Sequence, residues 1–292
     1  MGRGASQRVP PATKPSRTKP AASARRPAGK KGRSVAPKKG PFRRLWSGTL
    51  SAVGGYFDES RNGWNMVALV APLFVVYQVG VLFTNGWRNG ADFVTPNLIR
   101  LLNNDAVWYF GVNAAVFAVC AALYFMRRSR KELAAPTPWL MFFESLTYAI
   151  SMGMVATKAL RYLNIPEDSA LAGAAGGEVK TVTDAIVMSV GAGAYEELLF
   201  RVILLGGMVW LLRNRHPLLK YGLPIVVSAL LFSAAHLVPI GIEPWSDFRF
   251  GYRLILGLIL GLLFVSRGFA IAVYTHTLYD IIVLVPRLLL GL

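Results

Sequence analysis

The sequence contains a single cysteine, Cys120, among its 292 residues, which excludes an intrachain disulfide and any metal site built from several thiolates. Charged residues are also scarce: Asp, Glu, Lys and Arg together make up 16% of the chain, whereas 54% of it is hydrophobic. Soluble globular proteins carry about 25% charged residues. The composition therefore excludes an ordinary soluble domain and favours a protein that folds in a lipid bilayer.

Acidic residues are missing from the first 44 positions, which hold 14 of the 32 Lys and Arg residues. The rest of the chain carries 18 basic and 15 acidic residues, so the formal net charge of +17 comes largely from this segment. Its other residues are mainly Pro, Ala, Gly and Ser, which cannot bury enough apolar surface to offset the entropy lost on ordering. Residues 1–44 are therefore predicted to form a disordered, polybasic tail.

The basic residues of this tail, within 3–44, have two interpretations. A polybasic segment beside a membrane domain is attracted to anionic lipid by about 1 kcal/mol for each basic residue near the surface. The same charges also act as a solvated signal that fixes the topology. A nucleic acid partner is not expected, since no aromatic residue precedes Phe42 to stack between bases.

Apolar runs of about 20 residues, long enough to span roughly 30 Å of hydrocarbon, recur from position 64 onward. No cleavable signal peptide is recognisable before them, so insertion is expected to use internal spans. The runs cover residues 64–83, 105–126, 139–160, 183–212, 222–240, 252–266 and 269–290. The predicted fold class is all-α, a polytopic bundle of about seven transmembrane helices, with N-terminal transmembrane helices in 45–182 and a further group in 183–292.

The distribution of Lys and Arg between the loops predicts the orientation. Two basic loops, 127–131 and 213–216, lie two crossings apart, on the side expected for the basic tail. Short loops rich in Lys and Arg stay in the cytoplasm, so the N-terminus is predicted to be cytoplasmic. The opposite loops are poorer in basic residues and carry Glu167, Asp168, Glu178, Glu243 and Asp247.

Ionisable side chains gather in three of the last four apolar runs. They are Glu196, Glu197 and Arg201 in the fourth run, His236 in the fifth, and His276 and Asp280 in the seventh. A charged group at membrane depth costs about 2.5–3.5 kcal/mol on insertion scales, so such a cluster indicates a functional site by default. At 1.5 Å per residue, Glu196 and the two histidines fall within a slab roughly 15 Å thick, which allows one cavity to hold all three.

Helix geometry separates the two glutamates. Glu197 and Arg201 are four residues apart on one face, where an ion pair satisfies both charges and makes them structural. Glu196 points about 100° away and has no Lys or Arg three or four residues from it, which makes it the candidate general base. His276 and Asp280 are also four apart, which suits either an acid that orients an imidazole or two residues on one cavity wall.

Each histidine taken alone has a simpler interpretation, because a single His on an apolar helix is usually a packed core residue. His216 lies in a basic loop and is expected to be merely solvated. The case for chemistry rests on a coincidence. The other two histidines both lie in membrane runs, in the half of the chain that holds the paired glutamates.

The ordered set of motifs resembles that of the CPBP family, the CAAX prenyl proteases and bacteriocin-processing membrane proteins. The motifs are Glu196-Glu197-x-x-x-Arg201, Phe232-x-x-x-His236 and His276-x-x-x-Asp280. The resemblance covers roughly 183–290 and implies a CPBP-like catalytic core in 183–292 with intramembrane endopeptidase activity. It implies that Glu196 activates water with the help of His236, and that His276 and the residue at 280 stabilise the oxyanion. The family often has Asn at this last position, whereas Asp280 donates a hydrogen bond only when protonated, and orienting His276 is its alternative role.

The resemblance leaves two mechanisms open. The preferred one is a glutamic mechanism without a cofactor; in the alternative, Glu196, His236 and His276 ligate zinc and leave one coordination position open. The expected substrate is a membrane-associated protein or peptide, cut near its C-terminus or its anchor. Bacterial relatives place the chain in the inner (plasma) membrane.

Two functions of other classes fit the same residues. Buried Glu, Arg and His groups also form ion or proton paths in transporters and channels, although the sequence shows no repeated halves. A non-catalytic immunity or scaffold protein would keep the same fold. The substitution Glu196→Gln separates the three, because it abolishes cleavage, alters ion coupling or leaves a scaffold unchanged. The oligomeric state is not predicted.

Overall fold

The computed structural model describes residues 54–84, 91–92, 94–127, 137–167, 179, 181–237 and 244–291, together with Gly2. The chain divides after Leu45 into two units, and every described residue apart from Gly2 belongs to the second, Trp46–Leu292. Some predictions concern residues outside these ranges: the tail 1–44, the loop positions 128–131, and Asp168, Glu178 and Glu243. They stay predictions.

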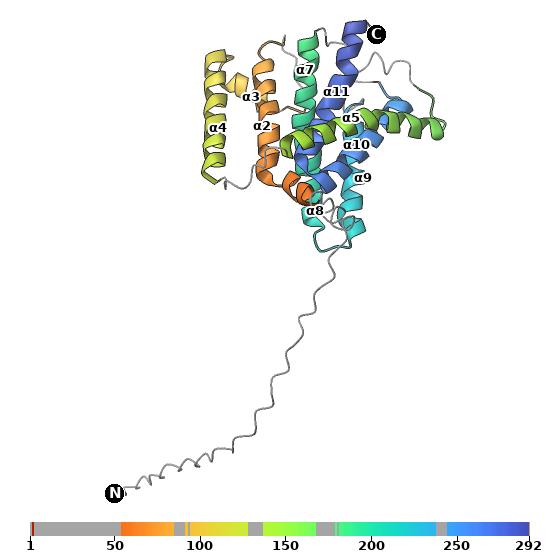
Figure 1. The fold of residues 1–292 in the computed structure, drawn as a ribbon, viewed down its shortest axis with the longest axis horizontal. Coiled ribbons are helices and arrows are strands. Elements are labelled where there is room, and N and C mark those ends of the chain that lie inside the picture. The colour runs from red at the N-terminus through yellow and green to blue at the C-terminus, as the bar shows by residue number, and fades with distance from the viewer. Residues whose placement is uncertain are drawn as a thin grey trace, which may run out of the picture. The chain divides into compact units, whose positions relative to one another are not determined.

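Every regular element in the described ranges is a helix, as the apolar runs predict. The longer helices, labelled in Figure 1, are α2 (Gly63–Gly80), α4 (Ala106–Arg127), α5 (Thr137–Tyr162), α9 (Leu223–Ala235), α10 (Asp247–Arg267) and α11 (Phe269–Leu290). Two shorter helices are α3 (Val94–Leu101) and α7 (Val182–Gly191). The all-α fold class is confirmed.

Five helices in the described part of the chain are long and apolar enough to cross a membrane. They are Ala106–Leu123, Thr137–Tyr162, Leu218–Ala235, Asp247–Arg267 and Phe269–Leu290. The pair Gly54–Ser60 and Asn65–Gly80, bent by 48°, adds a sixth if it crosses as one span. The predicted seven spans are not confirmed. Part of the difference lies in the run 183–212, which carries several charges and is divided into short helical segments.

This run of short segments holds both glutamates. After α7 it continues as two π-helical segments, η1 (Ala192–Glu196) and η2 (Leu198–Gly206), and ends with α8 (Gly207–Leu211). A capping box fixes its start: the Thr181 side chain accepts from the Asp184 amide, and the Asp184 carboxylate accepts from the Thr181 amide. π-Helical turns are rare and concentrate at functional sites. The candidate base is the last residue of η1.

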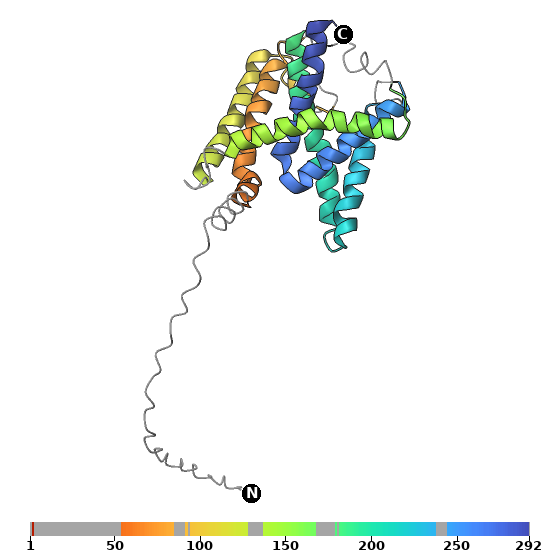
Figure 2. The ribbon, with the colours of Figure 1, turned by 45° about the vertical axis from the view of Figure 1, so that its right-hand side comes forward.

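The helices that carry the ionisable residues assemble around α11. This helix packs against α5, α7, α10 and η1, while α9 packs against α10 and η2. Figure 1 and Figure 2 show α5 running across α11, and α2 lies between α4 and α7 in Figure 1. α10 and α11 fold back on each other at Gly268, whose φ of +94° is a conformation that favours glycine.

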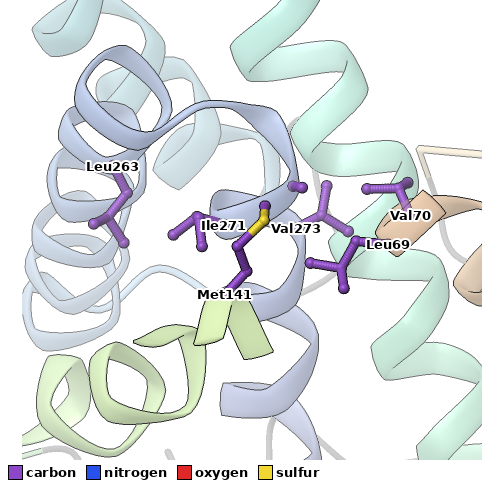
Figure 3. Packing of buried hydrophobic residues seen from close by; sticks show 7 residues of the cluster. Leu69, Val70, Met141, Leu263, Ile271 and Val273 are labelled. Atoms are coloured by element: carbon purple, nitrogen blue, oxygen red, sulfur yellow. The ribbon is translucent and has the colours of Figure 1, made fainter. Parts of the chain in front are cut away.

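A cluster of buried apolar side chains fixes α11 against its neighbours, as Figure 3 shows. Its labelled members are Leu69 and Val70 of α2, Met141 of α5, Leu263 of α10, and Ile271 and Val273 of α11. Lipid tails are as apolar as these side chains, so the cluster stabilises the bundle through close dispersion contacts rather than through release of water. The packed segment lies just before the part of α11 that carries the candidate functional residues.

A glycine allows η1 to approach α11 closely. A Cβ added at Gly193 would meet Oγ1 of Thr277 and would lie 2.8 Å from the carbonyl oxygen of Val273. Small residues at such contacts let membrane helices pack with their backbones close together. Glu196 is three residues beyond Gly193, and His276 is three residues beyond Val273, so the contact brings these two side chains together.

Candidate active site

Four residues that the sequence marks for chemistry line one cavity of about 290 Å³. Glu196 comes from the end of η1, His236 follows the end of α9, and His276 and Asp280 come from α11. Glu196 and His276 are buried, whereas the side chain of His236 is 26% exposed. The fold therefore joins residues that the sequence places on three separate runs.

Glu196 faces both histidines. Its Oε2 lies 3.6 Å from Nε2 of His236 and 3.9 Å from Nε2 of His276. Both separations exceed a direct hydrogen bond, which is about 2.7–3.2 Å long. Polar groups separated by more than about 3.5 Å are often bridged by a water.

His236 is oriented by its own helix. Its Nδ1 lies 2.8 Å from the carbonyl oxygen of Phe232, and the two rings pack edge to face with their centroids 4.9 Å apart. Because a carbonyl oxygen only accepts, Nδ1 carries the proton, and in the neutral ring Nε2 presents its lone pair toward Glu196. The first residue of the Phe232-x-x-x-His236 motif thus positions the last.

His276 is held by Glu197, a contact that the sequence did not predict. Nδ1 of His276 lies 2.8 Å from Oε1 of Glu197, a carboxylate oxygen that accepts the hydrogen bond. Asp280 lies 3.6 Å from the other ring nitrogen, Nε2. Of the two roles that helical spacing left open for Asp280, this geometry favours a place on the cavity wall beside His276.

The Glu197 carboxylate also joins His276 to Arg201. Nε of Arg201 is 3.1 Å from Oε2 of Glu197, and both side chains are fully buried. The guanidinium donates a hydrogen bond of 3.4 Å to the carbonyl oxygen of Gly257 in α10 and lies over the Phe232 ring, 4.6 Å from its centroid. Removing one partner of a buried ion pair costs about 3–5 kcal/mol. Glu197 therefore combines a structural contact with a positioning contact.

A buried polar network holds η1 through Tyr195, the residue before Glu196. The Tyr195 hydroxyl accepts from the Gln78 amide at 2.8 Å and lies 3.3 Å from the Thr95 hydroxyl. Tyr77 packs against the Tyr195 ring, with centroids 5.2 Å apart, and donates to Asp92 at 2.8 Å. Sequence reasoning missed this network, although a lone Gln in the first apolar run was a signal for it. The network anchors the residue next to the candidate base.

The cavity also extends along α10 and α11, to residues that the sequence analysis did not select. This part of the described lining carries Arg253 and Arg287, together with Tyr252 and Tyr279, whose hydroxyl oxygens lie 2.6 Å apart. Most of the remaining wall is apolar and includes Met152, Met188, Leu256, Leu260, Val283 and Leu284. Neither arginine was singled out from the sequence. The signal was there, because a charged residue within an apolar run indicates a functional site.

In the zinc alternative, Glu196, His236 and His276 would ligate the metal ion. Within the described ranges, no group of three or more His, Cys, Asp or Glu side chains is placed to hold a metal ion. These three residues, in this arrangement, do not fit a zinc site. The glutamic mechanism without a metal ion stays a prediction.

The fold and the cavity together define the class of protein. The chain is an all-helical integral membrane protein in which a Glu and two His side chains meet among helices apolar enough to span a bilayer.

Residues 178–282 match the model of a protein family described as type II CAAX prenyl endopeptidase, Rce1-like. The matched segment contains every motif residue from Glu196 to Asp280, so the resemblance predicted from the motifs is confirmed for this part of the chain. At the level of the family, the match supports a CAAX-type intramembrane protease, which implies a peptide or protein substrate. Arg287 lies beyond the matched segment. Neither the curated proteins nor the solved structures include a match to the chain.

Proposed function

We propose that this protein is an intramembrane endopeptidase of the glutamic type, which hydrolyses a peptide bond of a membrane-associated protein or peptide near its C-terminus or its anchor. One observation carries the proposal: the Glu196 carboxylate lies 3.6 Å and 3.9 Å from the imidazole nitrogens of His236 and His276, in a cavity among apolar helices. The family match over 178–282 supports the reaction class.

The reaction begins with a water held between Glu196 and His236. Glu196 takes one proton from this water, and the hydroxide attacks the carbonyl carbon of the scissile peptide bond. Nε2 of His236 accepts a hydrogen bond from the other O–H and so orients the nucleophile. When the tetrahedral intermediate collapses, the C–N bond breaks and Glu196 gives its proton to the leaving amine. The products are a carboxylic acid and an amine.

His276 supplies the donor for the oxyanion. Its Nδ1–H is bound by Glu197, so Nε2 faces the cavity. A proton on Nε2 makes the ring a cation, which the carboxylates of Glu196, Glu197 and Asp280 surround. A donor fixed in advance where negative charge develops contributes roughly 10²–10³ in kcat. Asp280, on the same wall, lies 3.6 Å from Nε2 of His276 and donates a hydrogen bond to the oxyanion only when it is protonated.

The location and the lipid contacts belong to the same proposal. The basic loops support a cytoplasmic N-terminus, and the resemblance to bacterial relatives supports a location in the inner (plasma) membrane. Reporter fusions to the described loop at 212–215 and to the C-terminal end test this topology. The basic residues within 3–44 would then lie against the anionic cytoplasmic leaflet.

The test is proteolysis by the purified protein in detergent and in liposomes. The substrates are membrane-anchored peptides, made in pairs with and without a prenyl group. Wild type is compared with Glu196→Gln and His236→Ala, each with and without a chelator. Glu167→Gln is the matched control, because Glu167 is an exposed carboxylate paired with Arg161 and does not line the cavity.

The outcomes separate the competing functions. Cleavage that survives chelation and is lost in both cavity variants supports the glutamic peptidase. Cleavage that chelation abolishes and zinc restores supports the metal alternative. If no peptide is cleaved in a way that depends on Glu196, the peptidase proposal is wrong, and a transporter, channel or scaffold takes its place.

A further inference from the structure

The cavity that holds Glu196 also holds two guanidinium groups in its described lining, those of Arg253 on α10 and Arg287 on α11. Both arginines lie within helices apolar enough to cross a membrane, and both are half-buried. Arg253 lies in the second turn of α10 and Arg287 in the last turn of α11. Charged residues within membrane helices usually face a cavity and mark substrate or ion sites. The mechanism of peptide hydrolysis does not use either of them.

Arg287 lies on the same face of α11 as two of the candidate catalytic residues. On α11, His276, Asp280, Val283 and Arg287 recur every three or four residues and all line the cavity. Arg287 lies about two turns beyond Asp280 on this face, and Arg253 lines the same cavity from α10.

The distance along α11 suits a short stretch of peptide. Arg287 is 11 residues beyond His276, which is about 16 Å at a rise of 1.5 Å per residue. An extended peptide covers about 3.3–3.4 Å per residue, so this distance corresponds to about five residues. A substrate whose scissile carbonyl lies beside His276 can therefore place a negative group against the arginines a few residues away.

We propose that Arg253 and Arg287 form a subsite that binds a carboxylate of the peptide substrate, up to about five residues from the bond that is cut. The inference rests on the proposed function, because it states which substrates that site selects. A guanidinium binds a carboxylate through two parallel hydrogen bonds, which gives geometric specificity as well as affinity. The carboxylate is either the C-terminal group of the substrate or an Asp or Glu side chain.

A lipid phosphate is the other anion that a membrane offers to a pair of arginines. The peptide carboxylate fits better, because the arginines line the same cavity as Glu196 and His276. A lipid headgroup held there would occupy the space that a peptide needs to reach the catalytic groups. Lipid binding is accordingly an outcome that the test must be able to detect.

The test uses three versions of one cleaved peptide: a free C-terminal acid, the C-terminal amide, and an amide that carries Glu as its last residue. Wild type is expected to cleave the acid at least about tenfold faster than the plain amide, in kcat/KM, the loss expected when a hydrogen bond to a charged group is not made. The Glu peptide distinguishes the sources, since it recovers the rate only if a side-chain carboxylate is accepted.

Arginine variants assign the preference to the subsite. Arg253→Gln and Arg287→Gln are expected to remove the preference for the acid over the amide in kcat/KM, and Arg→Lys at each position is expected to restore part of it. The unfolding midpoint of each variant shows whether it is folded. Arg213→Gln is the matched control, because Arg213 lies on an exposed turn outside the cavity.

A binding assay separates this inference from the peptidase proposal. Fluorescence anisotropy with full-length Glu196→Gln measures peptide affinity without turnover, and the acid is expected to bind at least about tenfold more tightly than the amide, a difference that either Arg→Gln change removes. Preferential binding without cleavage in wild type would overturn the peptidase and support the subsite. Equal binding of acid and amide overturns the subsite. The subsite is also overturned if the Arg→Gln changes weaken binding to anionic lipid vesicles but do not alter the affinity for either peptide.

Discussion

Nδ1 of His276 lies 2.8 Å from Oε1 of Glu197, so the second glutamate of the pair, and not Asp280, holds the imidazole that faces the cavity. The other oxygen of the same carboxylate lies 3.1 Å from Nε of Arg201. Glu197 thereby binds one partner on its own helix and one on α11, while Glu196 faces the cavity. Two adjacent glutamates have separate roles because they project in different directions from one helix.

Replacing Glu197 by Gln is expected to lower both stability and activity. The change leaves the buried Arg201 without its counter-charge, a loss of about 3–5 kcal/mol, and weakens the hydrogen bond to His276. Thermal unfolding in detergent and the cleavage rate measure the two effects. In the double variant Glu197→Gln/Arg201→Met, stability should largely return while activity stays low. Full activity in that double variant would contradict the positioning role.

Activity is expected to survive the replacement of Asp280 by Asn but not its replacement by Ala. Asp280→Asn supplies an N–H donor toward the oxyanion and should retain kcat within about threefold, whereas Asp280→Ala removes the polar group and should lower kcat by about 10²-fold. Steady-state rates on one peptide give both numbers. Equal rates for the Asn and Ala variants would show that the residue at 280 does not act on the oxyanion.

Gly193→Ala is expected to destabilise the contact between η1 and α11. The added Cβ meets Oγ1 of Thr277 and a backbone oxygen 2.8 Å away, and overpacking of this kind costs about 1–3 kcal/mol. Gly207→Ala is the matched control, because a Cβ at Gly207 has nothing within 4 Å. The unfolding midpoints of the two variants make the comparison. A Gly193 variant as stable as the Gly207 variant would mean that the two helices are not packed this closely.

The tail is expected to bind anionic lipid through charge alone. A peptide covering residues 3–44 should bind vesicles that contain phosphatidylserine and should not bind neutral phosphatidylcholine vesicles. Raising the salt from about 0.1 M to 1 M shortens the Debye length from about 10 Å to 3 Å and should release the peptide. Co-sedimentation measures the bound fraction, and a peptide with Gln at every Lys and Arg is the control. Binding that persists in high salt would contradict the electrostatic account.

The fold class and the residues of the candidate site follow from the sequence because they depend on local patterns. Long apolar runs predict membrane helices, and charges within those runs single out Glu196, His236 and His276. The spacing of four residues between Glu197 and Arg201 is also local, and the two side chains do form an ion pair.

Contacts between helices could not be read in the same way. The hydrogen bond from His276 to Glu197 depends on how η1 and α11 pack, and Gly193 controls that approach. The π-helical register of η1 and η2 departs from the regular 100° per residue, so a helical wheel does not give the directions of their side chains. The count of seven spans did not allow for charges and breaks within the run 183–212.

The most direct measurement is the single-turnover rate of cleavage of one peptide by purified wild type and by Glu196→Gln, with Glu167→Gln as the surface control and with the unfolding midpoint of each variant recorded. The account predicts that Glu196→Gln slows cleavage by about 10²–10⁴-fold at an unchanged midpoint, since a general base contributes that much, while the control keeps the wild-type rate. A folded Glu196→Gln variant that cleaves the peptide at the wild-type rate would contradict it.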